Sequence, residues 1–313
     1  GAPLASGDSD TLLLATGVTP ADGDVIEIYV TDVNGSTDDD QTNDTLTFTV
    51  SEGLAGTRII GPSAGADFPT VDAAFTAVEA RSLCGAIQLL IEPGVYDVNT
   101  TFDGPITGNS ATNTIFLISQ TNTAADFTLQ NTSATTGNNY IIQSNGVNYL
   151  TFSGLTFEDV SFGDAIGRLI ELPSDAMDVN VQNSVFLGDT TTNVEGSFDT
   201  DLALFEMDDN AQVDSIDILN NTFHGGAWAL QLDGPFGPDV SGHNVQGNTF
   251  FNWGNRAIEM DDAFDGNIID NTFIMNQPFA GTEAIWTDDV ENLVVSGNLV
   301  WNPNQGTGIE IMD

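Results

Sequence analysis

The chain has 313 residues, with 46 Asp and Glu against four Arg and no Lys, and its formal net charge is −42. A protein that grips phosphates places Lys or Arg opposite them, so this charge argues strongly against nucleic acid or anionic lipid as a partner. Hydrophobic residues make up 40% of the chain, which is enough to bury a core, yet no apolar run approaches the ~20 residues of a membrane span.

The same charge repels itself, and salt or bound divalent cations would relieve that repulsion. A saline or calcium-rich extracellular setting fits this composition, and a general acidity without any specific ion site fits it equally well. The single cysteine, Cys84, excludes an internal disulfide. We expect it to be packed at the end of an apolar helix.

Residues 1–54 are predicted to form a partial β-sandwich segment, because β-rich runs occur at residues 11–16, 24–31 and 46–50. Three strands are too few to close a sandwich. The missing strands are therefore expected either before Gly1 in a longer polypeptide or from a neighbouring chain.

An acidic loop separates the last two of these runs. Asp32, Asn34, Ser36 and Asp38 follow the alternate spacing of a calcium-binding loop. The loop has Thr37 where an EF-hand has its glycine and Asn43 where an EF-hand has its bidentate glutamate, so it is not an EF-hand. A looser calcium-binding hairpin and a solvated acidic turn both remain open.

One helix is predicted at about residues 70–82. Thr70 is a suitable N-cap residue. An apolar face at helical spacing follows it, formed by Val71, Ala74, Phe75 and Val78. An apolar strand at residues 87–91 comes next.

From about residue 146 onward the chain repeats. Six times, an apolar residue is followed five positions later by a second one, with a polar pair rich in Gly and Asn between them: Phe152/Phe157, Val181/Phe186, Ile218/Phe223, Val245/Phe250, Ile268/Phe273 and Val295/Val300. One longer interval contains a polar insert at residues 188–201. Gly and Asn accept the left-handed backbone that a tight corner needs, which favours a solenoid of short strands.

A second strand recurs once per repeat. In residues 257–260, strand alternation places Ile258 and Met260 in the core and Glu259 toward solvent. Trp286 occupies the same central position one repeat later, so it is the best candidate for a ligand-contact residue.

These repeats resemble those of the pectate-lyase-like superfamily of right-handed parallel β-helices. The resemblance rests on Asn220-Asn221-Thr222-Phe223, Gly247-Asn248-Thr249-Phe250 and Asp270-Asn271-Thr272-Phe273, and covers about residues 58–313. Phe68-Pro69-Thr70-Val71 resembles the N-terminal cap of such folds, those of pectin methylesterases included. The resemblance implies an all-β fold with a right-handed parallel β-helix at residues 55–313. One N-terminal helix caps this β-helix, and the partial Ig-like β-sandwich segment precedes it.

Aspartates follow the second strand in successive repeats, at Asp208, Asp209, Asp233, Asp261, Asp262, Asp288, Asp289 and Asp313. Two charges at the ~4.8 Å spacing of neighbouring strands repel by about 0.9 kcal/mol in water and about 3.5 kcal/mol at an effective dielectric constant of 20. Calcium, which prefers carboxylate oxygens, would offset this repulsion. Alternatively, these aspartates accept hydrogen bonds from backbone amides of the turns and bind no metal. The predicted calcium ligands are Asp32, Asn34, Asp38, Asp208, Asp209, Asp261, Asp262, Asp288 and Asp289.

The sequence does not predict an enzyme. The catalytic Asp pair and Arg of the pectin methylesterases have no counterpart here, and we expect Arg168 and Arg256 to pair with neighbouring acids. Together with the resemblance of the whole arrangement to type IX-secreted surface proteins of Bacteroidetes, this predicts an extracellular structural or adhesive module of a large surface or filament protein. We expect it to self-associate or to continue into further repeats, with a glycan or cell surface as its other partner. A polysaccharide-binding module, lyase or hydrolase is the alternative.

Overall fold

The computed structural model describes residues 24–29, 45–50, 52–135, 138–160, 167–191, 194–197, 202–235, 240–279, 281–303 and 306–312. The chain divides into two compact units, Gly1–Gly53 and Leu54–Asp313. In the first, β1 (Val25–Tyr29) and β2 (Thr45–Thr49) pair antiparallel, with Ile26 opposite Phe48. The predicted sandwich stays a prediction, because residues 1–23 and 30–44 lie outside the described residues.

The second unit contains three long parallel sheets. The first sheet consists of β3 (Leu54–Ile60), β4 (Leu83–Ile91), β7 (Ile115–Ser119), β10 (Leu150–Ser153), β13 (Ala176–Gln182), β16 (Val213–Leu219), β20 (Asn244–Gln246), β24 (Asn267–Ile269) and β27 (Val294–Ser296). The second consists of β5 (Gly94–Asp97), β8 (Phe127–Gln130), β11 (Thr156–Glu158), β14 (Val185–Leu187), β17 (Thr222–His224), β21 (Thr249–Phe251), β25 (Thr272–Ile274) and β28 (Leu299–Trp301).

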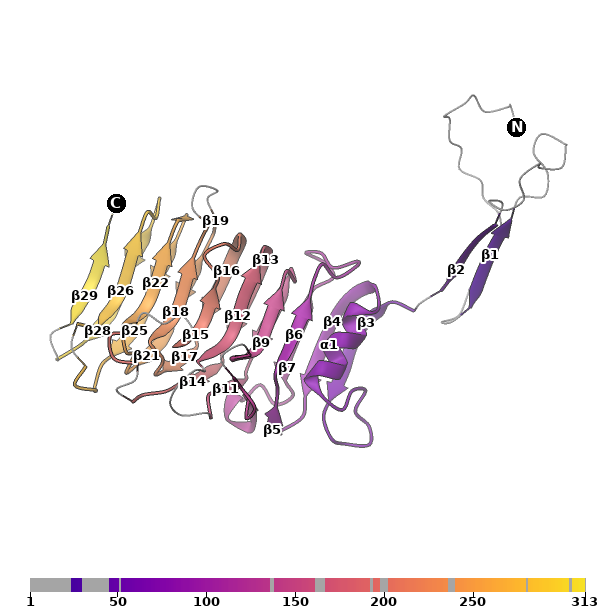
Figure 1. The fold of residues 1–313 in the computed structure, drawn as a ribbon, viewed down its shortest axis with the longest axis horizontal. Coiled ribbons are helices and arrows are strands. Elements are labelled where there is room, and N and C mark those ends of the chain that lie inside the picture. Colours follow the sequence, from indigo (N-terminus) through magenta and orange to yellow (C-terminus); the bar gives the residue numbers. More distant parts are fainter. Residues whose placement is uncertain are drawn as a thin grey trace, which may run out of the picture. The chain divides into compact units, whose positions relative to one another are not determined.

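The third sheet consists of β6 (Thr100–Asp103), β9 (Tyr140–Asn145), β12 (Arg168–Ser174), β15 (Ala203–Met207), β18 (Trp228–Asp233), β22 (Arg256–Asp261), β26 (Glu283–Asp288) and β29 (Thr307–Ile311). Its strands lie side by side along the molecule in Figure 1. Two short strands, β19 (Val240–Ser241) and β23 (Ala263–Phe264), pair outside the three sheets, and a 3-10 turn spans Ala124–Asp126.

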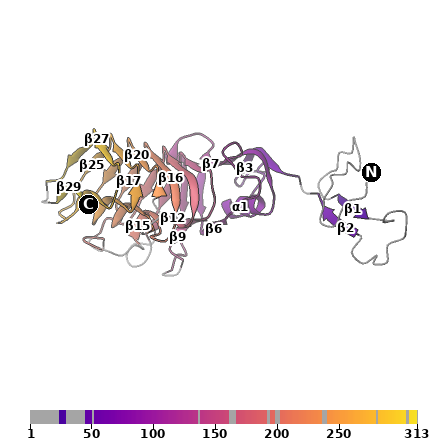
Figure 2. The same cartoon turned by 90° about the horizontal axis from the view of Figure 1, so that it is seen from above.

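From β4 onward the chain passes through the first, second and third sheets in turn, and each strand pairs in parallel with the equivalent strand one turn later. We call one such turn a rung. Figure 2 shows strands of the first sheet, among them β7, β16, β20 and β27, on the opposite side of the stack from β6, β9, β12 and β15 of the third. The unit is therefore a right-handed parallel β-helix, and the predicted fold class is confirmed.

Phenylalanines fill the interior on the second sheet. Phe223, Phe250 and Phe273 are in register and fully buried, and their ring centroids are 5.1 and 4.9 Å apart along the stack. Phe157 and Phe186 extend the same stack toward the N-terminus, which confirms the interior row predicted from the five-residue spacing. Such stacked contacts add to the burial of apolar area that drives folding.

The two residues of the polar pair between the first and second sheets have different structural roles. The first member takes the left-handed backbone, with φ of 55° at Asn220, 70° at Gly247 and 54° at Asp270. The second member points inward, so that Asn248 and Asn271 are each 1% exposed and hydrogen-bonded to one another. The sequence had predicted the left-handed corner without separating these two roles.

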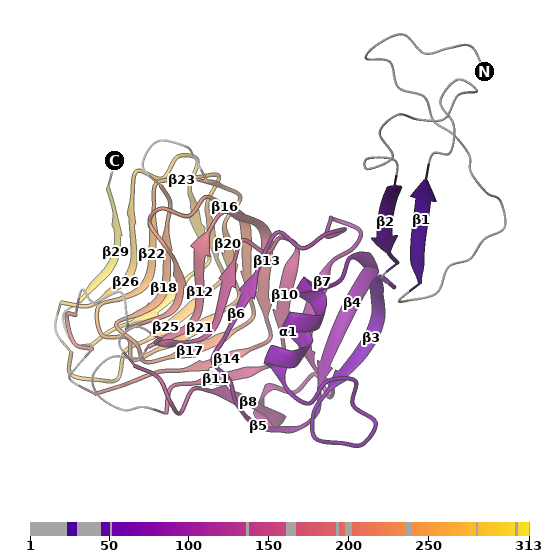
Figure 3. The same ribbon diagram turned by 45° about the vertical axis from the view of Figure 1, so that its right-hand side comes forward.

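Helix α1 (Val71–Glu79) covers the N-terminal end of the stack, where Figure 3 shows it lying between β6 and β3. The Thr70 hydroxyl accepts a hydrogen bond from the Ala73 amide, as expected of the N-cap. Phe75 stacks on Phe102 of the first rung with 4.1 Å between ring centroids. No helix in the described ranges is long and apolar enough to cross a membrane. Cys84, predicted to be packed at a helix end, is instead exposed on β4.

Candidate functional site

The outward face of the third sheet carries a row of polar side chains from successive rungs. Glu171, Glu206, Gln231, Glu259, Trp286 and Glu310 are in register along it. Arg168 makes ion pairs with Glu171 and Glu206, and Arg256 lies 2.9 Å from both Glu259 and Glu283. The predicted pairing of both arginines with neighbouring acids is thereby confirmed.

Glu259 differs from the prediction that it faces solvent, because it is only 7% exposed. Two consecutive buried residues, Ala257 and Ile258, interrupt the strand alternation. This break brings Arg256 onto the same face as Glu259, and the ion pair together with the stacked neighbours covers the carboxylate. Strict alternation would have placed residues 256 and 259 on opposite faces.

Trp286, the predicted ligand-contact residue, lies on this outward face and is half-buried. The Arg256 guanidinium carbon lies 3.8 Å from its ring centroid, the geometry of a cation–π contact. Part of the ring is therefore already used within the protein, and the remainder is accessible.

Aspartates gather where the strands of the third sheet end, on β15, β18, β22 and β26. We call this set the acidic ridge: Asp208, Asp209, Asp233, Asp261, Asp262, Asp288 and Asp289. Asp233, Asp261 and Asp288 are in register on successive rungs. Asp262 and Asp289 follow with positive φ of 48° and 45°, and each donates its backbone amide to the carboxylate of the residue before it.

Three of these carboxylates come close together. Asp233, Asp261 and Asp262 each offer an oxygen atom, and these atoms all lie within 4.8 Å of one another. Burial, and then the charges of Asp261 and its neighbours, raise the pKa of Asp233 to about 7. Burial and neighbouring carboxylates likewise raise the pKa of Asp261 to about 6, and burial is the main cause of the raised pKa of Asp262.

A hollow of about 150 Å³ adjoins this cluster on the side of the preceding rungs. It is lined by Arg168, Glu206, Met207, Asp208, Asp209, Gln231 and Asp233. Gln231 is 6% exposed, and its amide oxygen has no hydrogen-bond partner in the described structure. A buried amide oxygen without a partner costs about 1–3 kcal/mol, so this oxygen is suited to accept a ligand.

The other predicted calcium ligands are placed differently. Asp208 and Asp209 both accept hydrogen bonds from Asn210. Burial favours a higher pKa at Asp208, but the Asn210 hydrogen bonds and the Arg168 charge outweigh it and lower that pKa, while sharing a hydrogen bond with Asp208 raises the pKa of Asp209.

Asp288 and Asp289 continue the ridge but stand outside the close group of three carboxylates. Asp32, Asn34 and Asp38 lie outside the described residues. Gln231 was not predicted as a site residue. The sequence does distinguish it: Gln231 is an amide at the strand position where the rungs on either side have Glu206 and Glu259.

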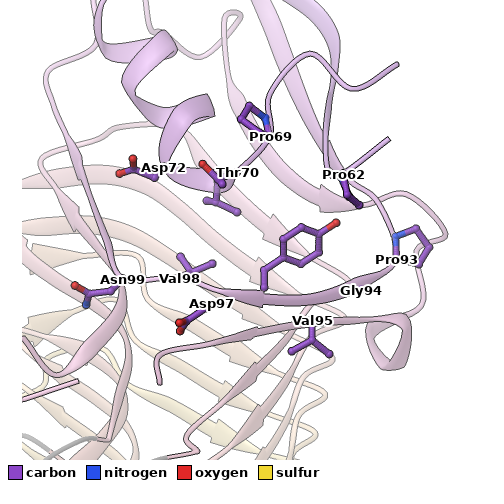
Figure 4. A pocket seen from close by; sticks show the side chains of 12 residues that line it. Pro62, Pro69, Thr70, Asp72, Pro93, Gly94, Val95, Asp97, Val98 and Asn99 are labelled. Carbon is purple, nitrogen blue, oxygen red and sulfur yellow. The ribbon is translucent and has the colours of Figure 1, made fainter. Parts of the chain in front are cut away.

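A second hollow, of about 530 Å³, lies beside the N-terminal cap. Figure 4 shows Thr70 and Asp72 at the start of α1 on one side and Pro93, Asp97 and Asn99 on the other. Its polar groups are occupied: Asp72 accepts from the Thr100 hydroxyl, and Asp97 accepts from the amide and hydroxyl of Thr132. The acidic ridge is therefore the stronger candidate site.

Comparison with known proteins places the fold in context. The family model of the right handed beta helix region matches residues 175–313. Among solved structures, the pectin methylesterase from Aspergillus niger, in two deglycosylated forms, is similar over 84% of this chain and 86% of its own, at 10% identity and a TM-score of 0.42. An alginate lyase of the PL6 family is similar over 85% of this chain and 41% of its own, at 14% identity and a TM-score of 0.44. No curated protein matches the chain.

Proposed function

We propose that the protein is an extracellular structural or adhesive module, in which the β-helix is a stiff support rather than a catalyst. The observation that supports this most is the state of Arg168 and Arg256. Each is held among glutamates at ion-pair distance. A cation already neutralised in this way is poorly placed to bind an acidic sugar or to assist proton abstraction from one.

The composition supports the extracellular part of the proposal. A surface of net charge −42 remains dispersed in a saline medium, where salt screens the repulsion between its carboxylates. The uninterrupted internal stacks of Phe and Asn supply stiffness along the axis, because each rung is fixed by its neighbours.

We further propose that the rung of β27, β28 and β29 is covered by another rung, from a second copy or from further repeats. Ile285 is fully buried, whereas Ile309, its register partner one rung later, is 43% exposed. In the same way, Thr287 is fully buried and Ile311 is 56% exposed. Exposed strand edges with apolar side chains are templates for pairing.

The first test measures degradation and adhesion together. The purified chain is incubated with neutral and uronic-acid polysaccharides while released sugar ends and unsaturated products are followed, and its retention on polysaccharide-coated surfaces is measured in parallel. We expect retention without product. Product formed in proportion to the amount of protein, and abolished by Arg256→Gln, would refute the structural proposal in favour of an enzyme.

A glycan-binding surface is the second candidate, favoured by the half-buried Trp286 ring on the outward face. Trp286→Ala distinguishes it from adhesion through the acidic surface as a whole. Loss of glycan retention in this variant, with the thermal midpoint unchanged, assigns binding to the ring. Equal retention by both proteins removes this candidate.

Self-association is tested by sedimentation velocity. Ile311→Asp places a charge on the exposed edge, while Val95→Asp changes another exposed apolar side chain, 68% accessible, at the opposite end of the β-helix. We expect the first change to reduce association and the second to leave it unaltered. Identical association by both variants would show that the edge is not the contact.

A further inference from the structure

We propose that Asp233, Asp261 and Asp262 bind one Ca²⁺ ion that joins two successive rungs of the β-helix, with the neighbouring hollow providing its remaining ligands. The three carboxylates come from the ends of β18 and β22, which pair directly, so a shared ion would act as a clamp between these rungs. The role is structural and is independent of the proposed adhesive function.

The spacing of the oxygen atoms is compatible with a single calcium ion. Calcium binds oxygen at about 2.3–2.6 Å, so two oxygens on opposite sides of one ion lie roughly 4.8 Å apart. The three carboxylate oxygens here fall within that separation of one another. Calcium also accepts irregular sets of carboxylate, amide and water oxygens, whereas magnesium requires near-ideal octahedral geometry at about 2.0–2.1 Å.

Gln231 provides an independent indication of a ligand. Gln231 and Asp233 are two residues apart on β18, so strand alternation directs both side chains outward, and both line the same hollow. The Gln231 amide oxygen is buried and lacks a partner. A calcium ion, or a water molecule that it orders, would satisfy this oxygen, and neutral amide oxygens are ordinary calcium ligands.

The hollow also has room for water. Its volume of about 150 Å³ exceeds the ~30 Å³ that one water molecule takes in the liquid, so several can enter. Calcium takes six to eight oxygen ligands, which three carboxylates and one amide supply only in part. Water molecules in the hollow would complete the coordination, and Asp208 on its far side would hydrogen-bond to them.

The experiment compares three variants of the whole chain at 150 mM NaCl after chelation and dialysis. Asp233→Asn and Asp262→Asn each remove one charge from the cluster. Asp265→Asn is the matched control. Asp265 lies three residues after Asp262 and has the same left-handed backbone, with φ of 58°, but it is outside the cluster. Calcium binding is measured by titration calorimetry, and thermal midpoints are measured with and without 1 mM CaCl₂ or MgCl₂.

We expect CaCl₂ to raise the wild-type midpoint clearly more than MgCl₂ does, with one ion bound per chain. Asp233→Asn and Asp262→Asn should weaken calcium binding at least tenfold, and Asp265→Asn less than twofold. Without calcium, the two cluster variants should melt at or above the wild-type midpoint because they relieve repulsion, which shows that they are folded. Equal binding by all three variants, or no calcium-specific shift, would overturn the proposal in favour of a diffuse ion atmosphere. Neither result would affect the adhesion assay.

Discussion

Replacing Asn248 by alanine tests the asparagine stack inside the first corner of the β-helix. The Asn248 side chain is 1% exposed and makes four hydrogen bonds. Its oxygen accepts from the amide and the side chain of Asn221, at 2.8 and 3.2 Å. Its nitrogen donates to the Ile218 carbonyl at 2.7 Å and to the Asn271 side chain at 3.0 Å.

Alanine would remove the hydrogen-bond partner of the buried Asn221 amide and one hydrogen bond to the Ile218 carbonyl. The unpaired amide costs about 1–3 kcal/mol and the bond lost at the carbonyl about 1 kcal/mol, so the free energy of unfolding should fall by about 2–4 kcal/mol. Asn298→Ala is the matched control. Asn298 makes the equivalent bonds to Asn271 and Ile268 but is only partly buried, so water can replace it at a cost of about 1 kcal/mol.

Urea unfolding followed by circular dichroism gives both losses on one scale, provided that the transitions are reversible and their slopes agree. The reasoning requires Asn248→Ala to lose clearly more stability than Asn298→Ala. Equal losses, or a loss below about 1 kcal/mol at Asn248, would mean that water enters the corner and that the side-chain stack contributes little.

Two further predictions concern the interior. His243 is fully buried, and neither ring nitrogen has a hydrogen-bond partner in the described residues. Burial lowers its pKa from 6.5 to about 4, against the opposing charge of Asp214, so the unfolded chain takes up this proton first. The free energy of unfolding is therefore unaffected by His243 titration above pH 6.5. It falls by about 3 kcal/mol as the pH drops toward 4, because the unfolded chain binds the proton and the folded chain does not. The difference between wild type and His243→Leu across this range isolates the effect from the carboxylates; a constant difference would contradict it. Phe250→Ala should cost about 3–5 kcal/mol in urea unfolding, because it opens a cavity between Phe223 and Phe273, whereas Val95→Ala at an exposed position should cost less than ~0.5 kcal/mol. Similar losses for both would contradict the buried stack.

The interior was predictable because it depends on spacing along the chain. Two apolar residues five apart, such as Ile268 and Phe273, must both face inward if a two-residue corner separates them, and both are fully buried. The division of roles within the corner also has a signal. In Gly247-Asn248 the glycine has no side chain to place in a stack, so the left-handed position must be the first of the pair.

The site was less predictable because it depends on what lies beside each strand. Asp261 and Asp262 were predicted as metal ligands, but their meeting with Asp233 depends on the register between β18 and β22. The burial of Glu259 depends on a local break in alternation at Ala257 that brings Arg256 over it. Periodicity carries no information on either point, because both arise from contacts between rungs.

Equivalent residues of successive rungs contact one another, and this affects how the β-helix can gain or lose a rung during evolution. Asn221 meets Asn248, Asn271 meets Asn298, and Arg256 meets Glu283, each across 27 residues. A duplication or deletion of the 27 residues 221–247 would keep asparagine stacked on asparagine and phenylalanine on phenylalanine, because Asn248 is equivalent to Asn221 and Phe250 to Phe223. Such a change would lengthen or shorten the β-helix by one rung with little disturbance to its core, because each rung contacts only its neighbours.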